Sequence, residues 1–503
     1  MRPVVKCSDP LEQDAGFIEE TDPALIVQAT VDRLAAGMAP ERLLKAAGIA
    51  VSRSTELPAD HHGGPVHPVC GLHPVLAMSR RLDGAASWVP IVQSVALANK
   101  HVHSDDMGPT LMPALDPLPV TGDADSQKAF LDSLWHRKPL AAERRLTGAL
   151  SALSSGQVLD LLLDIAVPRN SLDDHYLLYP VYAARALDAL GWDHGDIVLR
   201  PCVRYLAGNP LLDTPSRDTA YDGYYDTNQR AFRAFSAIDE LIDRHGLLER
   251  GGAAGAHESA AIGALGERLG ELDDYDRVAE LVAQAMADGL SLAGTAEALS
   301  YGAGLLSLRT DSGNPFNSHF HTGINARRWL LTREGIGART RLRALLSWAC
   351  GPEVRLMRDT MVWSASAEPT ALDRLPRQSA AIGAAIEALV RGAAPLDIDS
   401  KGNVNDFHLP KEVRQVMALA QRHEALGFDA APLFDRLVRL TATDDLSEMH
   451  VYKLVQAAYE EYHATRAPFR WVHLATAAKH VYCCYAFHPH AVYDQARPFL
   501  AAE

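Results

Sequence analysis

The sequence lacks most of the features that identify a ligand or a compartment. Six cysteines occur in 503 residues, none in a CxxC pair, which excludes a disulfide scaffold and indicates a reduced, cytoplasmic protein. Lys and Arg number 48 against 63 Asp and Glu, a net charge of −15, and basic runs are no longer than arginine pairs. Proteins that bind nucleic acid present a basic face, so we expect no nucleic-acid partner.

Long apolar runs are also missing. The N-terminus lacks the apolar region of a signal peptide, and no apolar run reaches the ~18–20 residues that a membrane span requires. We therefore expect no membrane association. The sequence also has no alternating strand pattern, no glycine pattern of nucleotide-binding folds, and no GxSxG or HExxH motif.

What the sequence does contain is helical periodicity. Segments rich in Ala, Leu, Arg and Glu carry apolar residues at i, i+3, i+4 and i+7. This pattern predicts helices over residues 23–47, 142–165, 175–190, 230–245, 257–270, 275–287, 339–350, 378–391, 411–426, 447–463 and 468–487. We predict an all-α fold: an N-terminal arm over 1–22 and one large multi-helix domain over 23–503. A proline-rich excursion is expected at 107–125.

Histidine is abundant, with 21 residues in the chain. Many of them fall in four compact groups: His61, His62, His67 and His73; His101 and His103; His319 and His321; His473 and His480. Several predicted helices begin with histidine, as at His175 and His321. His73, which precedes a proline, is expected at the start of another helix. This loose internal repetition suggests a helical array that directs the N-terminal ends of several helices to one interior place.

Neutral imidazole is the commonest protein ligand for iron, zinc, copper and nickel. A metal site needs three or four histidines that converge from different segments, and the four groups could supply them. The candidate ligands are His67, His73, His101, His321, His473 and His480. No standard metal-binding motif is present, and a surface or capping role is the alternative for each residue.

The His-led helices, the element His319-Phe-His-Thr-Gly323, and a near-terminal helix with His473, Lys479 and His480 resemble the questin oxidase-like family. The resemblance implies an oxygenase of aromatic polyketides that holds a mononuclear non-haem iron with several histidines and a carboxylated lysine. It implies His73, His321 and His473 or His480 as ligands and Lys479 as the modified lysine, with Lys100 as the alternative. Six residues apart on one helix, Lys479 and His473 point about 120° away from each other. This angle departs from the family's pattern, in which both residues would bind one metal.

We therefore expect an Fe(II)-dependent oxygenase or oxidase that combines O2 with a hydrophobic small molecule, for instance an aromatic one. Tyr176 and Tyr224 are candidate active-site residues, and Tyr179 and Trp471 are further candidates for a pocket lining. Two alternatives stay open. One is a zinc- or manganese-dependent hydrolase or lyase in which the metal activates water. The other is a non-catalytic helical-repeat binding protein whose histidines are structural.

Overall fold

The computed structural model confirms the all-α prediction. It describes residues 4–57, 64–170, 174–208, 235, 237–250, 258–271, 277–311, 315–348, 363–394, 408–443, 448–486 and 490–500. Within these ranges the regular structure is helical, apart from one isolated β-bridge between Val4 and Pro113. None of the described helices combines the length and apolar character needed to cross a bilayer.

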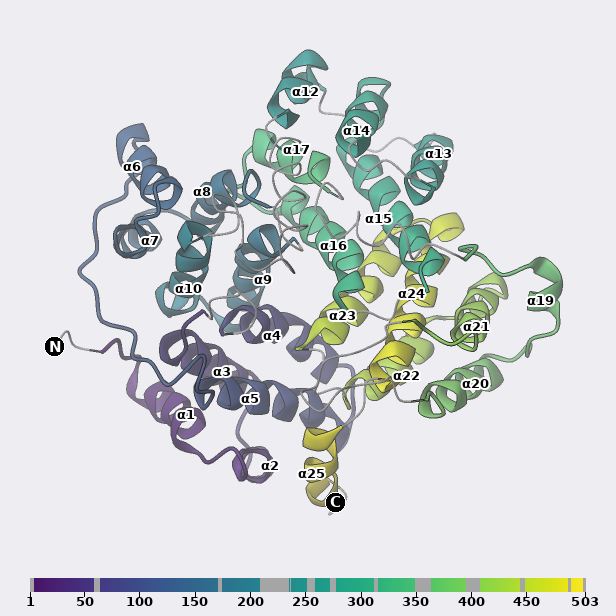
Figure 1. Cartoon of the computed structure of the whole chain (residues 1–503), viewed down its shortest axis with the longest axis horizontal. Helices are drawn as coiled ribbons and strands as arrows, with labels where there is room; N and C mark the ends of the chain where they lie inside the picture. Colours follow the sequence, from purple (N-terminus) through teal and green to yellow (C-terminus); the bar gives the residue numbers. More distant parts are fainter. Residues whose placement is uncertain are drawn as a thin grey trace.

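The helices follow one another with short connections in most of the described chain (Figure 1). The first part forms α1 (Asp9–Glu20), α2 (Ile26–Ala35), α3 (Pro40–Ser54), α4 (Val66–Ser79), η1 (Gly84–Ser87), α5 (Trp88–Val102), α6 (Ala124–Trp135), α7 (Pro139–Ala152), α8 (Ser155–Ala166), α9 (His175–Leu190) and α10 (Gly195–Gly208). The middle part forms α12 (Ile238–Arg244), η2 (Leu247–Glu249), α13 (Ser259–Gly270), α14 (Val278–Ala287), α15 (Leu292–Arg309), η5 (Pro315–Ser318), α16 (His319–Thr332) and α17 (Ala338–Leu346). The last part forms α19 (Pro369–Asp373), α20 (Ser379–Arg391), α21 (Val413–Ala425), α22 (Ala431–Thr441), α23 (His450–Ala464), α24 (Ala467–Ala486) and α25 (Ala491–Leu500).

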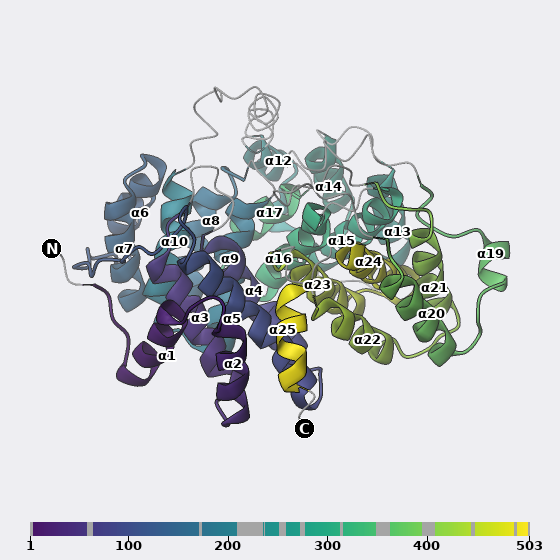
Figure 2. The same ribbon diagram turned by 60° about the horizontal axis from the view of Figure 1, so that its bottom comes forward.

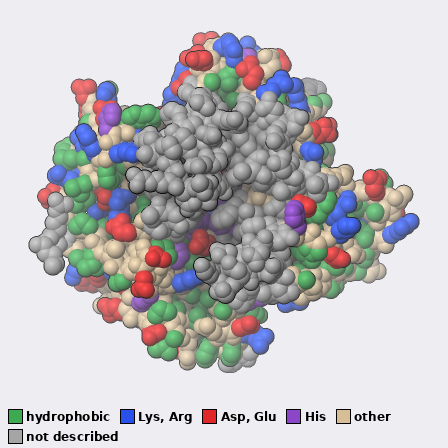
Figure 3. Space-filling model, in the orientation of Figure 1, with side chains coloured by type: hydrophobic (Ala, Val, Ile, Leu, Met, Phe, Trp, Pro, Cys, Tyr) green, Lys and Arg blue, Asp and Glu red, His purple; other side chains and the backbone are tan. Residues whose placement is uncertain are grey.

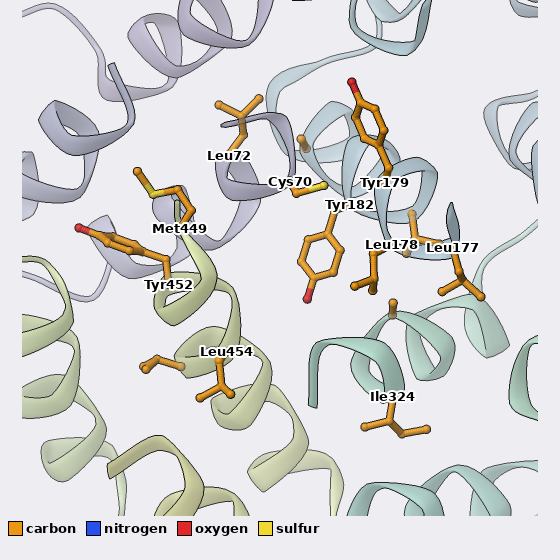
Figure 4. Packing of buried hydrophobic residues seen from close by; sticks show 14 of the residues in the cluster. Cys70, Leu72, Leu177, Leu178, Tyr179, Tyr182, Ile324, Met449, Tyr452 and Leu454 are labelled. Carbon is orange, nitrogen blue, oxygen red and sulfur yellow. The ribbon is translucent and has the colours of Figure 1, made fainter. Parts of the chain in front are cut away.

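Four helices from distant parts of the chain form the centre of the molecule. Helix α4 packs against α9 and α23, and α16 packs against the same two helices, so the four close a ring. The other helices surround them, with α3, α5, α10, α15 and α24 among the nearest (Figures 1 and 2). Figure 4 shows the apolar packing here, with Cys70, Leu178 and Tyr182 close together where α4 meets α9. Acidic and basic side chains intermingle on the outer face seen in Figure 3.

Two expected helices are each broken into two. Residues 23–47 form α2 and the start of α3, because Gly37 adopts a left-handed φ of 90° and Pro40 takes the first turn of α3. Proline fits this position since the first turn has no partner for its missing N–H. Residues 142–165 are divided at Ser154, which caps α8 in a reciprocal capping box with Gln157.

The expected helix start at His73 is wrong. Helix α4 begins at Val66, with Pro68 in its first turn and Pro74 inside it. Residues 1–22, expected as an arm, contain α1, which packs on α3. Arg53 of α3 donates to Glu12 at 2.6 Å and to Glu19 at 2.7 Å. The segment 107–125 is non-helical up to the start of α6, as its prolines predict.

Candidate metal centre

Four buried histidines meet where the four central helices begin. His175, His319 and His450 are the first residues of α9, α16 and α23, and His67 is the second residue of α4. Each is at most 5% exposed. Their rings touch in a closed cycle, with centroid distances of 5.0 Å for His67–His175, 5.0 Å for His175–His319, 5.2 Å for His319–His450 and 4.7 Å for His450–His67. We call these residues the histidine ring.

Three histidines of the ring place potential metal ligands near one another. One ring nitrogen each from His67, His175 and His450 lies within 4.8 Å of the others. Two nitrogens on one metal, bound at about 2.1 Å, lie roughly 3–4 Å apart, so a small contraction brings these three onto one ion. The imidazole of His319 packs against those of both His175 and His450 but is not part of the group of three whose nitrogens lie within 4.8 Å of one another. The donor set therefore fits a metal that prefers imidazole.

Left-handed residues start three of these four helices. Gly64 has φ of 59°, Asp174 has φ of 59° and Met449 has φ of 65°, each within three residues of its histidine. Glu448, at φ 50°, precedes Met449. Non-glycine residues rarely adopt this conformation, which costs about 1–3 kcal/mol and concentrates at functional sites. Each left-handed residue is followed by the first turn of a helix, and the histidine in that turn faces the other members of the histidine ring.

Charged groups surround the ring. The Lys453 Nζ lies 3.3 Å from Nδ1 of His67, and a carboxylate oxygen of Glu448 lies 3.5 Å from its Nε2. Asp174, before His175, accepts two hydrogen bonds from the fully buried Arg327, at 2.5 and 2.9 Å. Burial alone would raise the pKa of Asp174, but the Arg327 guanidinium holds it below its ordinary value. The start of α9 is thus fixed by a charged pair that ties it to α16.

The same four helices form a second polar ring further along their length. Each helix adds one residue, and the polar contacts follow the same cyclic order: His73–Arg185 at 2.8 Å, Arg185–Asn325 at 2.6 Å, Asn325–Glu460 at 2.9 Å and Glu460–His73 at 3.2 Å. Both contacts of His73 are made by Nε2. Burial would raise the pKa of Glu460, but Arg185 and His73 hold it well below its usual range.

The two rings give the direction of the helices. His73 and Asn325 follow the histidines of their own helices by six residues, and Arg185 and Glu460 follow theirs by ten. At 1.5 Å per residue, the polar ring lies about 9–15 Å from the histidine ring. Since all four helices start at one ring and continue to the other, they run parallel, with their N-termini together.

The ligands expected near the C-terminus form a separate group. His321 Nε2 lies 3.1 Å from His473 Nδ1, and Nε2 of His473 lies 3.3 Å from Ser300 and from Thr465. Burial lowers the pKa of His321 to about 3 and the pKa of His473 and His480 well below the ordinary value. The imidazoles of this second group are therefore held neutral, and those of His321 and His473 are hydrogen-bonded.

Lys479 does not reach the histidine ring. Its amine donates to the carbonyl oxygens of Ser307, at 2.6 Å, and Thr310, at 2.5 Å, at the C-terminal end of α15. Burial lowers its pKa to about 8. A cation is favourable against the last carbonyls of a helix, so Lys479 caps α15.

The other expected residues are also dispersed. His101 Nδ1 lies 2.6 Å from the Gly64 carbonyl, which supports the segment before α4. Tyr176 packs its ring 4.8 Å from Tyr205 in the core. Lys100 and Trp471 belong to α5 and α24. Tyr224, His61 and His62 lie outside the described residues.

Of the six expected ligands, only His67 is in the histidine ring. His175 and His319 stand at predicted helix starts or in the predicted histidine groups but were not expected as ligands, and neither His450 nor Lys453 was predicted. A usable signal was present, because each ring histidine is one of the first two residues of a helix that follows a turn. The sequence matches no known family model, no curated protein and no solved structure.

Proposed function

We propose that the protein is a metal-dependent oxidoreductase whose non-haem iron is held by His67, His175 and His450, with His319 beside them. The observation that carries the proposal is the convergence of four buried imidazoles from four separate helices. Imidazole suits iron, and three protein nitrogens leave further coordination positions for other ligands. Iron would supply a redox-active centre able to react with O2. A hydrophobic small molecule is the proposed substrate class.

The neighbouring residues would support such a centre through His67. Glu448 lies on the side of Nε2 and Lys453 on the side of Nδ1. A carboxylate against one ring nitrogen fixes the tautomer and raises the basicity of the other. The resemblance to questin oxidase-like proteins implies a modified lysine, and the buried lysine at the ring is Lys453, not Lys479. We assign that role to Lys453.

One face of α23 connects the two rings. Glu460, whose side chain is 27% exposed, accepts a hydrogen bond from Gln456 Nε2 at 2.9 Å. Lys453 lies three residues before Gln456, and residues three or four apart share a helix face, so the two side chains lie on the same side of α23. This line of polar side chains leads from the partly exposed Glu460 toward Lys453 beside His67.

A zinc-dependent hydrolase is the second candidate. Three histidines beside one carboxylate also form a set in which zinc activates water and the carboxylate acts as a base. The 40% exposed Glu448 side chain, 3.5 Å from His67, favours this alternative.

Metal analysis of untagged protein, purified without chelators, tests the proposal. We expect about one equivalent of metal per chain, and about none after His450→Ala. The control is His463→Ala on the exposed side of the same helix. Iron supports the oxidoreductase and zinc supports the hydrolase. Less than ~0.2 equivalents after incubation with Fe(II) or Zn(II) would contradict both.

A further inference from the structure

A groove that contains none of the ring histidines carries an unusual charge pattern. It lies between α25, the η1–α5 corner, and the ends of α20 and α22, with a cavity volume of about 350 Å³. Figure 2 shows α25 standing between α2 and α22 at the front of the molecule. The volume falls in the ~300–1,000 Å³ range of small-molecule sites.

Three arginines from three helices line this groove. They are Arg391 at the end of α20, Arg439 on α22 and Arg497 on α25, and none of the groove's lining residues is acidic. This is notable in a chain with a net charge of −15. Guanidinium groups bind carboxylates with two parallel hydrogen bonds. The groove is thus a local cationic site on an acidic protein.

The arginines are only partly neutralised by the protein. Arg391 donates to Glu387 at 2.9 Å. Arg439 is 3.8 Å from Asp83, a carboxylate that is 99% exposed. Arg497 makes no ion pair with any residue in the described parts of the chain. At least two guanidinium groups therefore have donors left for a ligand.

The rest of the lining is apolar. Leu82, Ala86, Val89 and Leu500 contribute alkyl groups, and Tyr493 contributes a ring. A ligand that matches both the arginines and the apolar lining has an apolar body and one anionic head group. We infer that this groove binds an anionic amphiphile, of which a medium-chain carboxylate is the simplest form. The inference does not depend on the proposed metal function.

Titration calorimetry with decanoate tests this site on the full-length protein, with decanol and acetate as separate probes of tail and head. We expect decanoate to bind and to lose at least ~10-fold in affinity in the double variant Arg439→Glu/Arg497→Glu, because two favourable charge contacts become repulsive. Arg244→Glu, at an exposed arginine of α12 that pairs with Glu280 and does not line the groove, should leave the affinity unchanged. Arg439→Lys/Arg497→Lys, which keeps the charge and loses the planar fork, should fall between the two.

The groove-filling variant Ala86→Trp provides an independent test. It should weaken decanoate binding at least ~10-fold while the arginines stay in place. Circular dichroism establishes that each variant is folded. The inference is overturned if decanoate does not bind the wild-type protein at millimolar concentration, if decanol binds as tightly as decanoate, or if the double variant keeps wild-type affinity.

Discussion

The protein contains two buried groups of histidines that differ in how their nitrogens are used. In the histidine ring, imidazoles from four helices face one another at the helix N-termini. In the second group, His321 and His473 contact each other and the hydroxyl groups of Ser300, Ser307 and Thr465. Burial and residue type are the same in both. The difference teaches that the arrangement of the rings, not burial or residue type, separates a candidate metal site, whose imidazoles face one another, from a structural network, whose imidazoles follow a chain of hydrogen bonds.

The largest expected effect is on metal affinity. His450→Ala should weaken metal binding more than about 100-fold, since even partners that only orient a ligand contribute 10–100-fold. His473→Gln, in the second group, should leave metal affinity within a few-fold of wild type. Competition with a chromogenic chelator measures both variants. Equal losses in the two would remove the distinction between the groups.

The next effect concerns the charged pair that fixes the start of α9. Arg327→Met leaves the Asp174 carboxylate without its guanidinium partner, and breaking a buried pair in this way costs about 3–5 kcal/mol. Urea unfolding of the metal-free protein measures the change. Arg339→Met, which breaks surface ion pairs with Asp239 and Asp243, is the control and should cost less than about 1 kcal/mol. Similar costs for both variants would contradict the buried role of Arg327.

The second group should make the metal-free protein sensitive to acid. The folded-state pKa of His321 is about 3, below its unfolded value of 6.5, and burial also depresses the pKa of His473 and His480. The unfolded chain therefore binds more protons, so stability falls as pH drops below 6.5. The slope reaches about 1.4 kcal/mol per pH unit for each such histidine, between pH 6.5 and the folded-state pKa.

Urea unfolding at a series of pH values measures this slope. His321→Leu should reduce it by roughly one proton, while His463→Leu on the exposed side of α23 should change it less. A pH-independent unfolding free energy between pH 4 and 6.5 would show that these histidines do not remain neutral in the folded protein.

The smallest effect tests the backbone before α4. A Cβ at Gly64 would lie 2.7 Å from the Glu56 carbonyl oxygen, at a φ of 59°. Gly427 has φ of 71° and no atom within 4 Å of its Cβ position. Both Gly→Ala variants incur the left-handed penalty of about 1 kcal/mol, and Gly64→Ala adds the clash. Gly64→Ala should therefore be the less stable of the two and should also weaken metal binding through His67. Equal stability would show that the segment is not constrained there.

The sequence predicted the all-α fold class and the start of α9 at His175. It also predicted that the N-termini of several helices share one interior place. Which histidines share it was not predictable from spacing. His319 and His321 are neighbours in the sequence, yet two residues are about 200° on a helix, so the first faces the histidine ring and the second faces α15 and α24. His450 follows two left-handed residues, and the second of them, Met449, packs closely against Gly71 of α4, a contact between distant parts of the chain. Lys453 was missed because a single buried lysine has no sequence signature.

The central claim is that a metal binds at the histidine ring and not at the second group. Anomalous diffraction at the iron absorption edge, from crystals of the iron-loaded protein, tests it directly. We predict one peak about 2.1 Å from a nitrogen of each of His67, His175 and His450. A peak between His321 and His473, or no peak at the ring in fully loaded protein, would contradict the account.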